Sequence, residues 1–158
     1  MMNRNLVIMM AGLFSFLSGC KGQGRKAEEF FSIGKFKVGQ IWKYDNREGE
    51  DSSTLTILKL EKYDVGDTII HIRVDGLNIY NPQSTAGKTT EIGHLPYSEK
   101  ALSKCVTKLV GQNNNLPDFS DGYNQWKEAW DSGKGGYWTA DLKEAINGID
   151  QGMRQHKK

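Results

Sequence analysis

The spacing of apolar and polar residues predicts three strands in the first half of the chain, at residues 36–44, 54–62 and 68–75. Apolar and polar side chains alternate cleanly along the third run, and Val38, Trp42 and Tyr44 share one side of the first, as in strands with one buried face. The connections between the runs are short, whereas parallel strands need long crossovers. We therefore expect an antiparallel meander. Residues 78–93 are predicted to be a polar loop, in which a short fourth strand would extend the meander.

In the second predicted strand, the apolar residues do not all fall on one side. Leu55 and Ile57 share one side of an ideal strand, whereas Leu58 and Leu60 share the other. Either a β-bulge re-aims the strand or both of its faces are partly buried. The third predicted strand is regular, with Ile70, Ile72 and Val74 on one side and Ile69, His71 and Arg73 on the other.

Apolar residues three and four positions apart predict three helices in the second half of the chain. The first begins after the N-cap residue Ser98, ends at Gly111 and has an apolar face made of Ala101, Leu102, Cys105, Val106 and Leu109. The second covers residues 118–132, and its stripe of Phe119, Tyr123, Trp126 and Trp130 is more typical of a core than of a cofactor site. The third begins at Thr139 or Asp141 and has a face made of Leu142, Ala145, Ile146, Ile149 and Met153.

Strands followed by helices indicate an α+β fold. The expected architecture is an antiparallel three- to four-stranded meander with about three C-terminal helices packed on one face. Residues 36–158 are long enough to form a single domain with its own core. Nothing in the composition indicates a disordered chain, because 37% of the residues are hydrophobic and 10% are aromatic.

The start of the chain has the order of a signal peptide. Arg4 precedes the mostly apolar residues 6–17, a run too short to span a bilayer. The run ends at Leu17-Ser18-Gly19-Cys20, where small residues precede a cysteine, and the chain becomes polar immediately afterwards. This pattern resembles the lipobox of bacterial lipoproteins. An ordinary secretory signal or a buried N-terminal helix is the alternative interpretation.

The lipobox resemblance implies that residues 1–19 are a signal peptide removed by cleavage before Cys20. Cys20 would then carry the lipid, and residues 20–35 would form a tether that holds the domain outside the cytoplasm on a bacterial membrane. More than one acyl chain makes such an anchor stable. The mature chain would hold 20 basic and 19 acidic residues, because only Arg4 is lost with the leader. These nearly equal numbers do not indicate a nucleic-acid-binding protein, because such proteins typically have a clustered basic face.

The two cysteines of the chain are Cys20 and Cys105. If Cys20 is acylated, Cys105 has no disulfide partner and is expected to be a small buried residue of the first helix. A Cys20–Cys105 disulfide in an unprocessed chain is the alternative.

The sequence predicts no catalytic residue, cofactor site or metal site. It contains no Gly-x-Ser-x-Gly motif and no histidine or cysteine pairs at zinc-ligand spacing. Gly87-Lys88-Thr89-Thr90 resembles the end of a phosphate-binding loop, but Pro82 stands where that loop needs its first glycine.

The best candidate for a partner or ligand face is a polar set made of Arg47, Glu50, His71, Arg73 and His94. In a meander, the first and third strands flank the second, so these side chains are predicted to share one sheet face. The alternative is a solvated sheet face with an ion pair in a loop, since surface ion pairs are common and individually weak.

The mature part is similar to an uncharacterised family of small bacterial proteins. The resemblance spans most of residues 38–146 and rests on Gly39-Gln40-Ile41-Trp42-Lys43-Tyr44, Arg47-Glu48-Gly49-Glu50, Ile70-His71-Ile72 and His94-Leu95-Pro96-Tyr97. It implies no activity.

We therefore expect a membrane-tethered lipoprotein of the cell envelope, whose domain is a non-enzymatic module that binds a protein partner. Its most specific version is an immunity protein against a toxin that acts in the periplasm. The alternative is an enzyme or small-ligand-binding protein that uses the polar sheet-face set.

Overall fold

The computed structural model describes residues 27–63 and 68–155. The predicted signal peptide, the predicted lipidation site Cys20 and the first part of the predicted tether lie outside the described residues. Among the described residues, no helix has the length and apolar character needed to cross a membrane.

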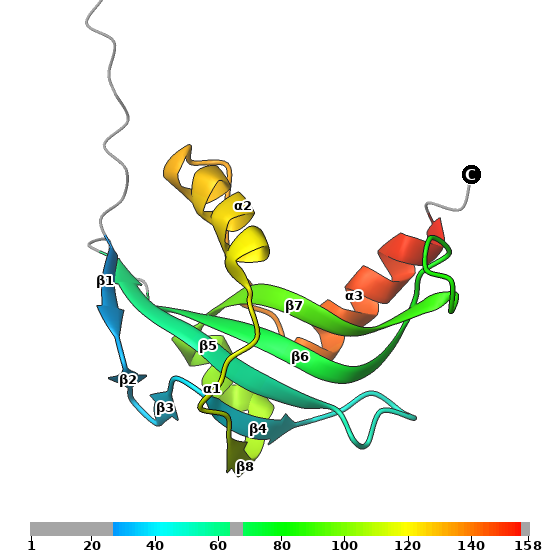
Figure 1. Cartoon of the computed structure of the whole chain (residues 1–158), viewed down its shortest axis with the longest axis horizontal. Coiled ribbons are helices and arrows are strands. Elements are labelled where there is room, and N and C mark those ends of the chain that lie inside the picture. Colours follow the sequence, from blue (N-terminus) through cyan, green and yellow to red (C-terminus); the bar gives the residue numbers. More distant parts are fainter. Residues whose placement is uncertain (1–26, 64–67, 156–158) are drawn as a thin grey trace, which may run out of the picture.

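Six strands of the described chain form one antiparallel sheet in the order β7-β6-β5-β4-β8, with β1 paired to β5 at the same edge as β4 (Figure 1). The strands of this sheet are β1 (Ala27–Phe30), β4 (Gln40–Tyr44), β5 (Thr54–Tyr63), β6 (Thr68–Tyr80), β7 (Lys88–Ser98) and β8 (Val106–Gln112). A separate small hairpin consists of β2 (Ser32–Ile33) and β3 (Phe36–Lys37). The helices are α1 (Glu99–Cys105), α2 (Ser120–Asp131) and α3 (Leu142–Gln155).

The predicted α+β fold with an antiparallel meander is confirmed, because β4, β5, β6 and β7 are successive neighbours in the sheet. Of the two explanations for the irregular pattern of the second predicted strand, both are observed, because Leu58 on the other face is also buried. The pairing of β5 with β6 shifts between Ile57 and Lys59. Leu60 therefore faces the same core as Leu55 and Ile57.

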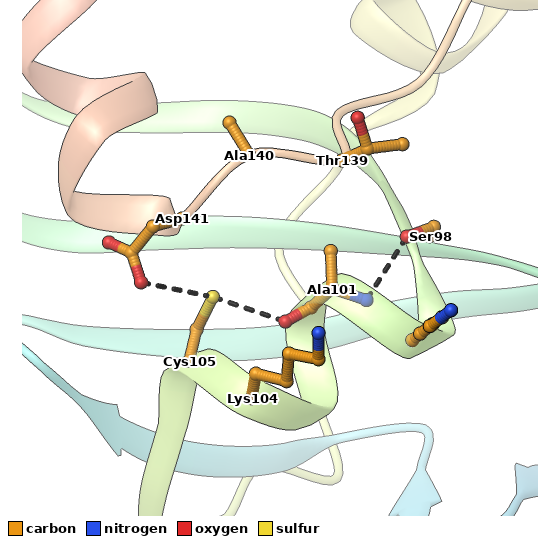
Figure 2. A pocket seen from close by; sticks show the side chains of 8 residues that line it. Ser98, Ala101, Lys104, Cys105, Thr139, Ala140 and Asp141 are labelled. Atoms are coloured by element: carbon orange, nitrogen blue, oxygen red, sulfur yellow. Dashed lines mark hydrogen bonds between the residues drawn. The ribbon is translucent and has the colours of Figure 1, made fainter.

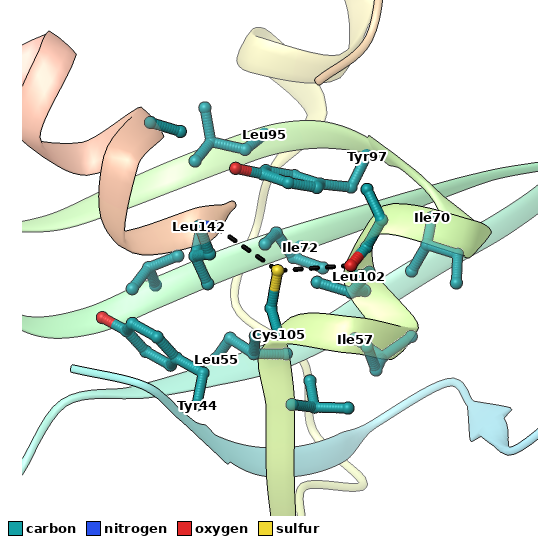
Figure 3. Packing of buried hydrophobic residues seen from close by; sticks show 14 of the residues in the cluster. Tyr44, Leu55, Ile57, Ile70, Ile72, Leu95, Tyr97, Leu102, Cys105 and Leu142 are labelled. Carbon is teal, nitrogen blue, oxygen red and sulfur yellow. Dashed lines mark hydrogen bonds between the residues drawn. The ribbon is translucent and has the colours of Figure 1, made fainter. Parts of the chain in front are cut away.

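The main core lies between one face of the sheet and the helices α1 and α3. Ile70, Ile72 and Val74 of β6 pack there against buried residues of both helices. Figure 3 shows this packing around Cys105, with Leu102 of α1 and Leu142 of α3 on either side. Leu142, Ala145 and Ile146 are buried, as the predicted face of the third helix required.

Helix α2 covers the opposite face of the sheet, which corrects the expectation that all three helices share one face. Its buried Trp130 packs with Ile69 of β6 and Tyr63 of β5 in a second cluster. Successive strand residues point to opposite faces, so Ile69 and Ile70 belong to different cores. In Figure 1, the segment before α2 crosses in front of the sheet, whereas α1 lies behind it.

The predicted helix over residues 98–111 is correct only in its first half. Ser98 caps α1 by accepting a hydrogen bond from the backbone N–H of Ala101 at 3.1 Å. The helix ends at Cys105, and Val106 begins β8, which pairs with β4. Leu109, expected on the apolar helix face, is 46% exposed in this strand.

The polar loop predicted at residues 78–93 is shorter in the structure, because β6 continues to Tyr80 and β7 begins at Lys88. Gly76 has a positive φ of 78°, and a Cβ there would lie 2.9 Å from the Cα of Ser53. This glycine permits an irregularity in the strand pairing, after which Leu77 and Ile79 rejoin the main core. Residues 27–30, expected in the tether, form β1 instead.

Candidate functional site: a buried glutamate and two histidines beneath helix α2

The site lies between α2 and the sheet face that α2 covers. Strand β5 supplies Glu61, β6 supplies His71 and β7 supplies His94. The pairing of β6 with β7 shifts between Ile72 and Val74, which places one extra residue in β7 next to His94. A bulge of this kind re-aims a side chain. Here the imidazole of His94 lies beside that of His71.

The three polar groups form a continuous chain of contacts. Nε2 of His71 lies 3.1 Å from Oε2 of Glu61, and Nδ1 of His71 lies 2.8 Å from Nε2 of His94. Glu61 and His71 are almost inaccessible to solvent, with exposed fractions of 1% and 0%. A carboxylate and two imidazoles are thus linked from the interior of the domain towards its surface.

The carboxylate of Glu61 is surrounded by donors. Tyr123 of α2 donates to Oε1 at 2.6 Å, and Tyr63 donates to Oε2 at 2.8 Å. The ammonium group of Lys59 lies 3.2 Å from Oε1 and 2.6 Å from the carboxylate of Glu29 in β1. Each oxygen of Glu61 therefore receives two polar contacts, as a buried charged group requires.

These contacts keep Glu61 ionised. Burial alone would raise its pKa, but the hydrogen bonds from His71, Tyr123 and Tyr63 outweigh burial and lower the pKa to about 2. Burial has the opposite consequence for the imidazoles. It lowers the pKa of His71, although the neighbouring Glu61 acts in the other direction. Burial, together with the neighbouring His71, lowers the pKa of His94 to about 4. At neutral pH the site therefore holds one carboxylate and two neutral imidazoles.

The charge states determine where the hydrogens lie. An ionised Glu61 only accepts hydrogen bonds, so Nε2 of His71 carries the hydrogen that points to it. Nδ1 of the neutral His71 is then a lone pair, and Nε2 of His94 must be the donor in the contact between the rings. Nδ1 of His94 is left as a lone pair.

A hollow of about 330 Å³ lies next to His94, between β7 and the beginning of α2. It is lined by Ile92, Gly93, His94, Asp118, Phe119, Asp121 and Gly122. A Cβ at Gly122 would lie 2.8 Å from the Cβ of His94. Because real side chains do not approach so closely, a glycine is needed here for α2 to pack against His94.

Aromatic rings enclose the polar chain. The ring of Trp126 lies 4.6 Å from that of His71, and the ring of Tyr123 lies 5.2 Å from it. Trp126 also stacks on Trp130 and donates from its indole nitrogen to the carbonyl of Gly136 at 2.7 Å. The predicted aromatic stripe of α2 therefore packs into the domain, as expected, but it covers polar groups as well as apolar ones.

The structure divides the predicted polar set into three separate places. His71 and His94 come together in the buried chain. Arg47 pairs instead with Glu50, which is 3% exposed, and with Asp150 of α3. Arg73 pairs with Asp75 at 2.9 Å and also with Glu91. The five residues do not form one face, and His71 is covered by α2.

A larger hollow of about 500 Å³ lies between α1 and the segment before α3 (Figure 2). Cys105 lies in its wall, where its thiol donates to the carbonyl of Ala101 at 3.2 Å and lies 3.7 Å from Asp141. Burial raises the pKa of this thiol, and a reactive thiol needs a lowered one. Cys105 is buried, as the sequence predicted.

Glu61, Tyr63 and Tyr123 complete the site, although no motif in the sequence marks them as site residues. The sequence does contain a weaker signal for them. Buried tyrosines need partners for their hydroxyl groups, and Glu61 lies in a strand whose two faces are both rich in apolar residues. Within the described part of the chain, no group of three or more His, Cys, Asp and Glu side chains is placed to hold a metal ion.

Comparisons with protein-family models, with curated proteins and with solved structures find no match to this chain.

Proposed function

We propose that this chain is a lipid-anchored protein of a bacterial cell envelope, whose domain is a non-enzymatic module that binds a protein partner. The anchor is supported by the order of the leader: Arg4, the apolar residues 6–17 and then Leu17-Ser18-Gly19-Cys20. The folded domain begins with β1 at Ala27, seven residues after Cys20. Seven residues reach at most about 25 Å, so the domain would stay close to the membrane surface.

The observation that carries the binding proposal is the open edge of the sheet at β8. Strand β8 pairs with β4 on one side, and no strand of the described chain pairs with its other side. Leu109 and Val110 of this strand are 46% and 45% exposed. Unpaired backbone groups flanked by apolar side chains form a docking site for an extended segment of another protein.

The same edge has irregular strand pairing, which disfavours association with other copies of the chain. The pairing of β4 with β8 shifts twice, between Ile41 and Trp42 and between Lys43 and Tyr44. Bulges interrupt the regular ladder of an edge strand and discourage the open-ended addition of further copies. A partner with a strand fitted to this edge is therefore favoured over self-association. The most specific version of this proposal is an immunity protein, whose partner is a toxin that it neutralises at the membrane.

The anchor is tested by labelling cells with radioactive palmitate and separating their membranes. The wild-type chain should take up the label and sediment with membranes, whereas Cys20→Ala should do neither. An unlabelled wild-type chain, or a Cys20→Ala variant that still sediments, would contradict the proposed anchor.

The binding surface is tested with the double substitution Leu109→Lys and Val110→Lys. It should abolish recovery of the partner from envelope extracts and leave folding unchanged, because both side chains are about half exposed. Phe31→Lys is the matched control, since Phe31 is 71% exposed and lies outside β8. If the partner's affinity is equally reduced by the control, β8 is not the binding surface.

A further inference from the structure

We propose that the partner segment that pairs with β8 alternates apolar and acidic residues, with its carboxylates facing the lysines at this edge of the sheet. This inference rests on the proposed binding function of the β8 edge and adds the chemistry of the partner. It is carried by the charges around β4 and β8, the two strands that form this edge.

The two segments that build this edge contain no acidic residue. Residues 30–44, which include β2, β3 and β4, and residues 100–117, which include β8, together contain six lysines. The rest of the chain holds all 19 acidic residues and only 15 of the 21 basic ones. Figure 1 shows β2, β3, β4 and β8 together at the lower end of the view. A nearly neutral chain therefore has one basic end. All six lysines except the half-buried Lys43 are exposed: Lys35, Lys37, Lys43, Lys100, Lys104 and Lys108.

The register of β4 with β8 places two of these lysines side by side. Lys43 is the cross-strand partner of Lys108. Like charges directly opposite each other destabilise a sheet. Lys43 turns its ammonium group to the backbone carbonyls of Asp51 and Ser53, at 2.5 and 3.2 Å, which leaves Lys108 at the edge. A carboxylate on an added strand would relieve the repulsion between the two lysines.

The same register determines how the partner must alternate. Cross-strand partners project to the same face, and successive residues of a strand project to opposite faces. Leu109 therefore lies on the face of its partner Trp42, and Lys108 lies on the opposite face with Lys43. A strand added to β8 would place apolar side chains beside Leu109 and acidic ones beside Lys108.

The carboxylates that border this end are engaged with other groups. Asp45 follows β4 and pairs with Lys143 of α3 at 3.3 Å. Glu99 begins α1 and accepts a hydrogen bond from Ser103 at 3.2 Å. Within the part of the chain that the structure describes, Lys108 forms no salt bridge with a carboxylate. Its charge is therefore available to a partner.

The open backbone favours a protein segment over other anionic surfaces. A membrane or a nucleic acid would use the ammonium groups and leave the unpaired backbone of β8 without hydrogen bonds. A second copy of the same edge is disfavoured, because lysine on an edge strand opposes an identical lysine. An acidic strand uses both the backbone and the charge, and complementary charge is what selects among possible partners of an interface.

The experiment follows the backbone amide resonances of β8 in the purified full chain at pH 7.5 while peptides are added. The acidic probe is a capped heptapeptide of alternating glutamate and valine, and the basic probe has lysine in place of each glutamate. We expect the acidic probe to bind at least tenfold more tightly at low salt. Added salt should reduce this preference, because it screens exposed charges. Equal affinities would overturn the acidic preference but keep the open edge, whereas no shift of β8 by either probe would overturn the binding function of the edge as well.

A third probe separates strand pairing from general attraction of anions. It is the acidic peptide with N-methyl groups on all its internal backbone nitrogens, which keeps the charge but cannot pair as a strand. It should bind at least tenfold more weakly than the unmodified acidic probe. Equal binding of the two would show that the lysines attract any anionic surface, such as a membrane, and would overturn the proposal.

A charge reversal at the edge makes the result specific to β8. Lys108→Glu should weaken binding of the acidic probe at least tenfold and strengthen binding of the basic probe, without lowering the urea midpoint of unfolding. Lys88→Glu is the matched control, because Lys88 is an exposed lysine of β7, at the opposite edge of the sheet. The control should change either affinity less than twofold. Equal losses in the two variants would mean that the net charge of the chain determines binding, and the proposed partner chemistry would be wrong.

Discussion

Nδ1 of His71 and Nε2 of His94 lie 2.8 Å apart, so that one hydrogen fits between the two rings. A second proton on either ring would place two donors face to face or add a charge to the interior. Burial lowers the pKa of both histidines, so the folded domain favours their neutral forms. This choice couples the packing of α2 to pH, because Tyr123 and Trp126 of that helix contact the ring of His71.

We predict that the domain loses stability as the pH falls from about 6.5 towards 4. An unfolded histidine takes up a proton near pH 6.5, whereas the folded domain holds the pKa of His94 at about 4 and lowers that of His71. The unfolded chain thus binds more protons in this interval, which favours unfolding. Glu61 acts in the same direction below pH 4.5, because its folded pKa is about 2. Urea unfolding measured between pH 8 and pH 4 checks the slope.

The variant His94→Gln tests whether the lowered histidine pKa values, and not acid unfolding in general, cause this pH dependence. It removes one of the two lowered histidine pKa values, so the loss of stability between pH 7 and pH 5 should become shallower. An unchanged slope would show that the pH dependence arises elsewhere in the chain.

We predict that Glu61→Ala lowers the free energy of unfolding by about 3–5 kcal/mol, the usual cost of removing one partner from a buried charged pair. The substitution would leave the hydroxyl groups of Tyr63 and Tyr123 and the Nε2 hydrogen of His71 without their acceptor. Glu91→Ala is the matched control, because Glu91 also forms an ion pair but its side chain is 49% exposed. The control should cost less than about 1 kcal/mol. If chemical denaturation gives the same loss of unfolding free energy for Glu61→Ala and Glu91→Ala, the buried contacts of Glu61 do not contribute more to stability than an exposed ion pair.

The alternation of apolar residues was sufficient to predict the central strands, and its break in β5 indicated either a bulge or two buried faces, both of which the structure shows. The pattern failed to predict β8 because a helix and a strand would bury the same residues of this segment. Val106 is buried at the end of α1, and a continuing helix would have buried it as well. The β-branched residues Val106, Thr107 and Val110 favour a strand, but helical spacing hid this preference. The pairing with β4, which lies about 65 residues earlier in the chain, decides the outcome.

The candidate site was less predictable because it depends on which face each helix covers. The sequence placed His71 on the polar side of β6 and correctly separated it from Ile70 and Ile72. It gave no sign that α2 would cover that side. Arg47 was grouped with His71 only through an assumed common face, and the structure pairs it with Glu50 and Asp150 instead.

We predict that Arg47→Ala destabilises the domain more than Arg73→Ala does. Arg47 neutralises the side chain of Glu50, which is 2% exposed, and also donates to the carbonyl of Asn78 at 3.2 Å. Its loss would leave a buried carboxylate without its cation, at a cost of about 3 kcal/mol. The partners of Arg73 are Asp75 and Glu91, which are half exposed, so its loss should cost about 1 kcal/mol or less. Thermal unfolding of the two variants gives the order, and a larger effect for Arg73→Ala would contradict it.

We predict that the thiol of Cys105 is protected from reagents in the folded domain. The side chain is 4% exposed, accepts a hydrogen bond from the backbone N–H of Leu142 at 3.4 Å and has a raised pKa. A disulfide reagent that releases a coloured thiolate, used at pH 8, should therefore react with Cys105 only as fast as the domain unfolds locally. Reaction should become immediate in urea. Rapid labelling of the native domain would show that the hollow beside α1 gives reagents access to the sulfur.

The last prediction concerns the aromatic side chains that hold α2 on the sheet. Trp130 is 3% exposed, and its ring lies 5.1 Å from that of Tyr63 and 5.6 Å from that of Trp126. Trp130→Ala should lower the free energy of unfolding by about 3–5 kcal/mol, the range for removing a large buried ring. Trp138→Ala is the matched control, because Trp138 is 36% exposed and meets β7 mainly through its backbone. It should cost clearly less. If chemical denaturation gives the same small loss for both, α2 is not held by this cluster, and the Glu61–His71–His94 chain would be open to solvent.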